Sequence, residues 1–449
     1  MRNLLILSCS LLFVGASAQD NFSGIGTSRR VGILNVGLNP AELSNLSSKY
    51  EFNLFGFSSS VTNNKIGFKD LTGDEDLEDL IFEGDETVNL RLDGEVYGPS
   101  FAFRLKKWGF GIITKSNIKV GLVDITPDLA DAINLNTIAG STTISSDYNQ
   151  RINGTTWGEV GFAVSRNLID TEKNKLSVGS TIKLLFPGSY INLGLNNLKG
   201  RIDTDGIGNA YLNDVHDVSL NIAYSGNLAE NFNDADSYTK AIFGSFSGIG
   251  ADIGFNYQRK DAKGYRLNAG LSVRNIGAMT YKDDNNSSTD YTLNIPNGTP
   301  TQPGLNLTQF DGAESIEDIE QVLLDSGYLD KSQKSSADFK TKLPTVFNAY
   351  VDYKVVPTFY VSLFTQQKLG SDNNNDQATV QNVITLTPRF SLKNFELYVP
   401  LSSNEIAGTA AGFGLRFYGF YVGSGSIITA LTSDSKQMDL NIGYRLGLK

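Results

Sequence analysis

The sequence predicts an all-β protein: a transmembrane antiparallel β-barrel of 14 strands, with 16 strands as the alternative. Two observations carry this prediction. From Met438 to Leu448, apolar residues alternate with polar residues or glycine, as in a strand with lipid on one side and a watery lumen on the other. The 449 residues also include 45 Gly, 26 Phe and 19 Tyr, yet past Val14 no apolar run approaches the ~20 residues of a membrane-spanning helix.

Residues 1–18 have the pattern of a secretory signal peptide. A positive start at Met1–Asn3 is followed by an apolar run over Leu4–Val14 and by small residues at Ala16–Ala18. Cys9 lies too early in that run for a lipoprotein cleavage site. If cleavage follows Ala18, the mature chain has no cysteine, because Cys9 is the only one. Disulfides and thiolate metal sites are then excluded.

Residues 19–49 do not have the pattern of a strand. Asn39 is a suitable N-cap, Pro40 suits the first helical position, and Glu42 is spaced to close a capping box. We therefore expect a short helix just before the first strand. The segment 19–49 is interpreted as a plug folded into the lumen, and a periplasmic lead-in is the simpler alternative.

Residues 50–449 repeat the alternation of the closing strand. It recurs at Ile249–Tyr257, Leu267–Val273, Phe347–Tyr353 and Phe413–Phe417. Short turns alternate with long loops, as in barrels with short periplasmic turns and long outer loops. The long loops are expected near residues 63–87, 121–153, 186–248 and 282–344. Both termini are then expected on the periplasmic side of a bacterial outer membrane.

The stretch between residues 187 and 248 decides the strand number. If Tyr190–Lys199 and Val215–Ser225 are both wall strands, the barrel has 16 strands. If both belong to one outer insertion, it has 14, which we favour. A soluble propeller is the main alternative fold, but no repeat of fixed period is visible, and inward residues such as Asp252 and Arg416 are charged.

Charges of both signs are predicted to line the lumen. We interpret them as ion pairs that stiffen the barrel, with an anion or polar-solute path as the alternative. These residues are Arg91, Arg104, Asp252, Arg266, Arg274, Asp352, Arg416, Asp439 and Arg445. The net charge of −10 excludes nucleic acid as a partner, because a phosphate-binding surface needs clustered cations.

Two outer loops carry helix signals. Thr126-Pro127-Asp128 caps a stretch that presents Leu129 and Ile133. Ser315, spaced three residues before Asp318, caps a second stretch that Gly327 ends. The second stretch presents the apolar residues Ile316, Ile319 and Leu323. These faces either capture an apolar solute or pack the loops onto the rim of the barrel.

No catalytic residue, metal site or cofactor is predicted. His216 is the only histidine, and Asp214 shares its strand face, whereas Asp217 and Ser219 point the other way. A barrel hydrolase is therefore a remote alternative.

Asp70–Glu86 holds nine acids in 17 residues, but Asp79 stands where a calcium loop needs glycine, which favours a solvated outer loop. A divalent-ion contact that bridges lipopolysaccharide phosphates is the alternative for this stretch.

The segment Asn39-Pro40-Ala41, followed at once by the first strand, resembles FadL-type transporters of hydrophobic compounds and the related PorV-type barrels. A more specific resemblance, to an uncharacterised Bacteroidota family of outer-membrane barrels, spans Asn39–Leu448. It is carried by Gly248–Gly254, Ser272–Gly277, Leu386–Phe390, Tyr398–Leu401 and Gly423–Ile427. Asn441–Leu448 also resembles the C-terminal signal read by the barrel-assembly machinery.

The resemblance implies passive transport of a small hydrophobic or amphipathic solute, with Asn39, Pro40 and Ala41 as plug or gate. The helices over the mouth are similar to the capture groove of FadL-type transporters. The PorV-type resemblance implies the alternative, a non-transporting accessory or scaffold subunit of an outer-membrane protein complex. The implied partners are outer-membrane lipid and lipopolysaccharide, the barrel-assembly machinery, and either a hydrophobic solute or an envelope protein.

Overall fold

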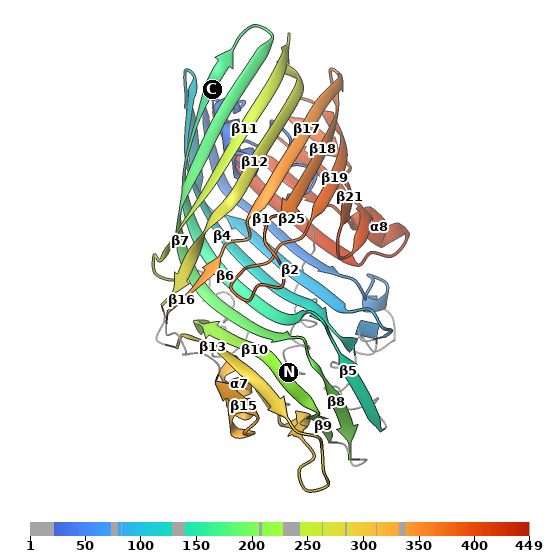
Figure 1. The fold of residues 1–449 in the computed structure, drawn as a ribbon. Coiled ribbons are helices and arrows are strands. Elements are labelled where there is room, and N and C mark those ends of the chain that lie inside the picture. Colours follow the sequence, from blue (N-terminus) through green and yellow to red (C-terminus); the bar gives the residue numbers. More distant parts are fainter. Residues whose placement is uncertain are drawn as a thin grey trace.

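The computed structural model describes residues 22–72, 80–81, 83–127, 140–205, 209–227, 243–262, 264–282, 285–310, 312–331 and 338–448. The predicted signal peptide, Leu129 and Ile133 lie outside these residues. The described chain forms an antiparallel sheet that closes into a ring of 14 wall strands (Figure 1). Closure is made by the last strand, which pairs with the first from Tyr50↔Leu448 to Thr62↔Gln437. No helix in the described part is both long enough and apolar enough to span a membrane.

Several wall strands are interrupted and are described by two labels. In ring order the wall strands are β1 (Tyr50–Asn63), β2 (Val88–Tyr97) with β3 (Ser100–Leu105), β4 (Trp108–Ile125), β6 (Asn149–Asp170), β7 (Asn174–Asn196), β11 (Gly248–Asp261), β12 (Gly264–Tyr281), β17 (Val346–Val356), β18 (Phe359–Lys368), β19 (Val383–Ser391), β20 (Phe395–Tyr398) with β21 (Leu401–Asn404), β22 (Gly408–Ala411) with β23 (Phe413–Phe417), β24 (Phe420–Ser424) and β25 (Gln437–Leu448).

The 14-strand prediction is confirmed, and the uncertain stretch shows why. Strand β7 runs without a break to Asn196, so the predicted strand at Tyr190–Lys199 is mostly the outer end of β7. The predicted strand at Val215–Ser225 is β10 (Val215–Ser225), which pairs with that outer end and with β13 (Ser287–Ile295). Both therefore belong to an insertion that extends the barrel wall at its long-loop end.

The insertion forms an outer subdomain with its own apolar core (Figure 1). Besides β10 and β13, the elements at this end are β5 (Ser141–Ser145), β8 (Lys199–Thr204), β9 (Ala210–Asn213), β14 (Leu305–Asn306), β15 (Leu329–Lys331), β16 (Phe339–Lys342), the 3-10 turns η3 (Asp70–Thr72) and η4 (Leu307–Phe310), and the helices α7 (Ile316–Asp325) and α8 (Ile427–Thr432). Strands β5, β8, β9 and β14 form a separate four-stranded sheet.

Outward and inward faces of the wall differ in polarity, as the alternation predicts. The outward side chains of β7 and β11 include Ile182 (58% exposed), Ile249 (60%) and Phe255 (49%). The inward neighbours Asp252 and Asn256 are 3% and 1% exposed. An apolar band around a closed ring of strands, with polar groups inside, is the solution that a lipid bilayer demands, because no backbone group is left unpaired in hydrocarbon.

Residues 22–49, hereafter the plug, lie inside the ring (Figure 1). They contain α2 (Ile33–Leu38) and η2 (Pro40–Asn45). The helix predicted at Pro40 is therefore a 3-10 helix, and α2 precedes it. Two glycines of the wall make room: a Cβ on Gly254 would lie 2.0 Å from Asn39 Oδ1, and one on Gly179 would lie 2.4 Å from the Pro40 carbonyl carbon.

Candidate functional site

The plug is anchored to the wall by Asn39, whose side chain is fully buried. Its oxygen accepts a hydrogen bond from Ala41 N at 3.0 Å, which caps η2 as the sequence predicts. Its amide nitrogen donates to the main-chain oxygens of Phe255 at 2.9 Å and Leu271 at 3.3 Å. One side chain therefore fixes both the start of η2 and its position against β11 and β12.

Glu42 is the second residue that anchors the plug to the wall. The prediction that Glu42 closes a capping box with Asn39 is wrong. Its carboxylate turns to the wall, where Oε1 accepts hydrogen bonds from Asn256 Nδ2 at 2.9 Å, Asn268 Nδ2 at 2.8 Å and Tyr350 Oη at 2.5 Å. Asn45 Nδ2 donates to the other oxygen at 3.1 Å. Four donors compensate the burial of this carboxylate, which is 4% exposed.

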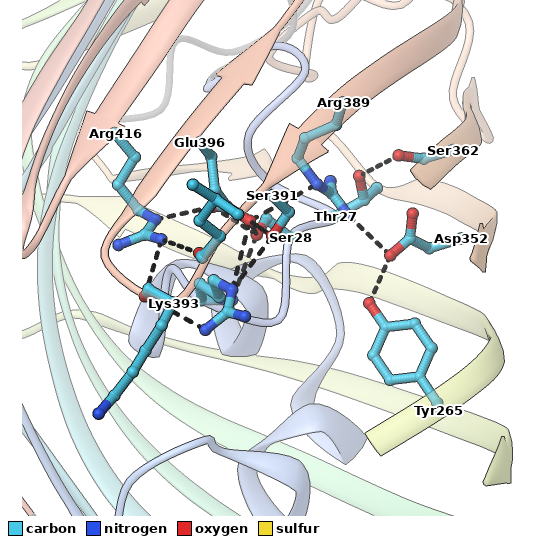
Figure 2. Close-up of polar contacts among 12 residues, drawn as sticks. Thr27, Ser28, Tyr265, Asp352, Ser362, Arg389, Ser391, Lys393, Glu396 and Arg416 are labelled. Carbon is cyan, nitrogen blue, oxygen red and sulfur yellow. Dashed lines mark hydrogen bonds and ion pairs between the residues drawn. The ribbon is translucent and has the colours of Figure 1, made fainter. Parts of the chain in front are cut away.

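A third anchor joins the start of the plug to β18, β19, β20 and β23, as Figure 2 shows. Ser28 Oγ donates to the Glu396 carboxylate, with distances of 3.1 and 3.0 Å to its two oxygens, and Arg416 Nε donates to the same group at 2.7 Å. Beside it, Thr27 Oγ1 lies 3.1 Å from Ser362 Oγ. The plug is thus held at two separate parts of the ring, by β11 and β12 and, beyond β17, by these strands.

The wall beside the plug carries a belt of alternating charge that crosses five neighbouring strands. It runs through Glu95, Lys115, Glu159, Lys183 and Asp252 on β2, β4, β6, β7 and β11. The Lys115–Glu159 and Lys183–Asp252 distances are 3.2 and 2.9 Å. Each buried charge has a partner of opposite sign, as buried ions require.

A second segment, residues 369–382, crosses the bore at the long-loop end; we call it the strap. It leaves the wall between β18 and β19 and contacts β2, β6 and β7. Asp372 forms an ion pair with Arg91 at 2.8 Å, and Asn375 accepts a hydrogen bond from Asn149 at 2.8 Å. The hydroxyl of Tyr190 donates to the main-chain oxygen of Asn375 at 2.5 Å. The strap therefore spans the lumen from β18 and β19 to the wall formed by β2, β6 and β7.

Two small cavities lie between plug and strap among the described residues. One cavity of about 40 Å³ lies against Gly37, Tyr97 and Phe364. Another of about 40 Å³ lies under Gln381 of the strap and beside Lys119. Each has room for water but not for a solute. Plug and strap both occupy the described part of the lumen, and we expect a solute to pass only when they move.

The outer subdomain contains an apolar cavity of about 80 Å³ beneath α7. Its lining includes Ile319 and Leu323 of α7 together with Ile152, Leu193, Leu220 and Phe310. The predicted cap at Ser315 is confirmed, with Asp318 completing a capping box, and the three predicted apolar residues of α7 are buried. In another protein, an engineered apolar cavity that binds benzene has a volume of ~150 Å³. The cavity beneath α7 is smaller, so α7 must shift outward before an aromatic ring can enter.

One buried acid holds α7 in place. Glu320 accepts hydrogen bonds from the hydroxyls of Tyr224 at 2.9 Å and Tyr291 at 2.6 Å, which lie on β10 and β13. Burial and the neighbouring carboxylate raise the pKa of both tyrosines well above the ordinary value. Both hydroxyls therefore stay protonated and donate to Glu320 at all physiological pH values.

Most of the predicted lumen charges are found inside the ring. Asp252, Asp352, Arg91, Arg416 and Asp439 are buried, and each contacts an oppositely charged or polar group. Arg274 and Arg104 donate to main-chain oxygens of the plug, at Gly37 and Ser48. Arg445 binds Glu51 at 2.7 Å. Their predicted roles beyond these contacts remain predictions.

Arg266 is a correction, because its side chain is exposed and donates to the hydroxyl of Tyr353. It is the extra residue of a β-bulge: Arg259 pairs with Leu267 and Lys260 with Tyr265, so no residue of β11 faces Arg266. A bulge shifts the alternation by one, which moves this side chain to the outside.

The described residues contain no cluster of ligands that would hold a metal ion. His216 is exposed and contacts Asp214 at 3.2 Å, without a serine in the contact. Much of the acidic stretch Asp70–Glu86 lies outside the described residues. The sequence predicts a long outer loop at Gly370–Ala378, but neither its inward course as the strap nor the wall contacts of Glu42 were predicted.

Residues 40–425 match the model of a family of unknown function, DUF5723. No curated protein matches the sequence. Similar solved structures include the toluene transporter TbuX of Ralstonia pickettii, 12% identical, with a TM-score of 0.43 and coverage of 97% of this chain and 96% of that chain.

The toluene transporter TodX of Pseudomonas putida is 10% identical, with a TM-score of 0.41 and coverage of 96% and 98%. The translocator domain of the autotransporter NalP from Neisseria meningitidis is 7% identical, with a TM-score of 0.35 and coverage of 92% and 94%. All three are barrels of the outer membrane.

Proposed function

The chain belongs to the DUF5723 family of unknown function, and on this premise we propose that it is a gated outer-membrane β-barrel for passive uptake of a small amphipathic solute. The short turns and both ends of the barrel sequence face the periplasm in this proposal, and the α7 subdomain faces outward. The solute binds beneath α7 and then crosses the lumen when the plug and the strap move.

The apolar cavity beneath α7 is the observation that carries the proposal. It lies in a part of the chain that extends beyond the lipid-facing wall, where no membrane requires an apolar lining (Figure 1). The helix over it is held by one acid between two tyrosines, and it is therefore a cover that can shift as a unit. Such a cavity suits the apolar part of a solute arriving from water.

The belt of alternating charge beside the plug argues against a purely apolar solute. A purely apolar molecule would pass Lys115, Glu159 and Lys183 without a partner for any of them. A molecule with one apolar end and one polar end fits both the cavity and the lumen. The proposal is therefore an amphipathic solute, not a hydrocarbon.

Swelling of proteoliposomes tests the proposal with two neutral solutes, phenyl β-D-glucoside and the smaller methyl β-D-glucoside. We expect the phenyl glucoside to pass faster through the wild-type protein, although a simple sieve passes the smaller molecule faster. Leu323→Phe fills the cavity and should remove this preference. Leu324→Phe is the matched control, because Leu324 is the neighbouring residue of α7 and is 43% exposed.

Faster passage of methyl β-D-glucoside through the wild-type protein would contradict capture beneath α7. The absence of passage of either solute would favour the second candidate, an accessory or scaffold subunit of an outer-membrane complex. One observation supports that candidate: the cavities between plug and strap are only about 40 Å³ each.

A further inference from the structure

We propose that Arg91 and Arg151 form a binding site for an anionic headgroup, and that the bound anion loosens the strap from β2 by taking the place of Asp372. The inference rests on the proposed uptake function and adds the charge of the solute. It places the first contact of the headgroup at the long-loop end of the lumen, on β2 and β6.

The two buried guanidinium groups of Arg91 and Arg151 share a single nearby carboxylate, that of Asp372, among the described residues. Arg91 is 4% exposed, and its Nη2 binds Asp372 at 2.8 Å. Arg151 is fully buried and donates to the main-chain oxygens of Asp372 at 2.7 Å and Gln377 at 3.3 Å and to the side-chain oxygen of Asn192. Among the described residues, the ion pair of Arg91 with Asp372 is the only one that either arginine forms, and Asp372 also pairs with Lys368 at 2.6 Å.

The same site contains buried N–H donors that form no hydrogen bond with the described residues. Nε and Nη1 of Arg91 are buried and have no hydrogen-bond partner among the described residues, and the same holds for Nδ2 of Asn153. Gly121 of β4 pairs with Arg91 on one neighbouring strand and with Asn153 on the other. The side chains of Arg91 and Asn153 therefore flank a glycine, which leaves space between them. A Cβ there would lie 3.2 Å from Asn153 Nδ2.

These features match the chemistry of a planar or tetrahedral oxyanion. A guanidinium presents its N–H groups as a fork that fits two oxygens of a carboxylate, sulfonate or phosphate. With Asp372 on Nη2 alone, most of the fork of Arg91 is unused. An arriving oxyanion accepts these hydrogen bonds from Arg91. Its negative charge is not buried alone, because it pairs with the positive charge of Arg91, which is already buried.

Exchange of the Asp372 carboxylate for the bound anion loosens the strap from β2. The side chain of Asp372 is 18% exposed, so the ion pair is reached from the long-loop end. After exchange Asp372 keeps Lys368, while the strap loses its ion pair to β2. The contacts of Asn375 with Asn149 and Tyr190 are neutral hydrogen bonds. Arg151 still donates to main-chain oxygens of the strap, and Lys342 still pairs with Asp376, so the exchange loosens the strap at β2 first.

Titration calorimetry with benzenesulfonate on the full chain in detergent micelles tests the site. We expect saturable binding that weakens at least tenfold in Arg91→Gln. Asp372→Asn should bind at least threefold more tightly, because the competing carboxylate is gone; a purely structural role of Arg91 does not predict this gain. Lys342→Gln is the matched control, since it removes an exposed cation that pairs with Asp376 of the same strap at 2.8 Å.

Absent binding in the wild type, equal binding in Arg91→Gln, or no gain in Asp372→Asn would each overturn the anion site. Migration on unheated gels shows whether each variant is folded, and if Arg91→Gln is not, the Asp372→Asn arm alone decides. Failure here is distinguishable from failure of uptake, because passage of the neutral phenyl β-D-glucoside does not depend on the charge of the headgroup.

Discussion

Glu42→Ala should loosen the plug while leaving the barrel closed on itself. Glu42 Oε1 is the acceptor for Asn268 Nδ2 at 2.8 Å and for the hydroxyl of Tyr350. Asn256 has other acceptors, at Asn268 Oδ1 and the main-chain oxygen of Ala269, and is not stranded by the change. Two buried donors therefore lose their acceptor.

Each buried donor that loses its acceptor costs about 1–3 kcal/mol of plug stability. Water that enters the space of the lost side chain can accept part of these hydrogen bonds, so we expect a total cost for both donors of about 3 kcal/mol. Because 1.4 kcal/mol corresponds to a factor of ten, the open state of the plug should be populated roughly 100-fold more. Hydrogen exchange followed by mass spectrometry over residues 33–45 reports that population directly.

Ser47→Ala, at an exposed position of the plug, serves as the control and should leave the exchange unchanged. Exchange of residues 33–45 in Glu42→Ala within threefold of the wild-type rate would refute the reasoning. Equal acceleration in β11 and β12 would also refute it, because the substitution would then act on the barrel and not on the plug.

Three further predictions concern the outer subdomain and the charged belt. Glu320→Gln weakens two charge-assisted hydrogen bonds, so α7 should loosen by about 1–2 kcal/mol and become more sensitive to limited proteolysis. Leu323→Ala enlarges the cavity and should lower stability by about 2–5 kcal/mol while increasing binding of benzene, measured by proton NMR. Lys115→Met leaves two carboxylates without their main cation and should cost about 3–5 kcal/mol in urea unfolding from lipid vesicles.

The barrel was predictable from the sequence because its signal is local. Alternation along each strand decides which side chains meet lipid, and the two length classes of connection decide which strands are neighbours. The same reasoning places Asp252, Arg416 and Asp439 inside the ring, where the structure has them. It failed at Arg266, because a bulge depends on the pairing of two strands and not on either strand alone.

The contents of the lumen were less predictable, because they depend on residues far apart in the sequence. The spacing of Asn39 and Glu42 fits a capping box, but Asn268 and Tyr350, more than 200 residues later, offer the carboxylate better partners. The strap is a polar stretch that reads as an ordinary outer loop. Its inward course follows from Arg151 and Asn149, which the barrel brings to the opposite wall.

The central claim is that the plug must move for a solute to pass, and a reversible lock tests it most directly. In Thr27→Cys/Ser362→Cys the two side-chain atoms that lie 3.1 Å apart become sulfurs placed to form a disulfide between plug and β18. The account predicts that the oxidised protein in liposomes excludes phenyl β-D-glucoside and that a reductant restores the wild-type rate. Equal rates before and after reduction, with the disulfide confirmed by mass spectrometry, would contradict it.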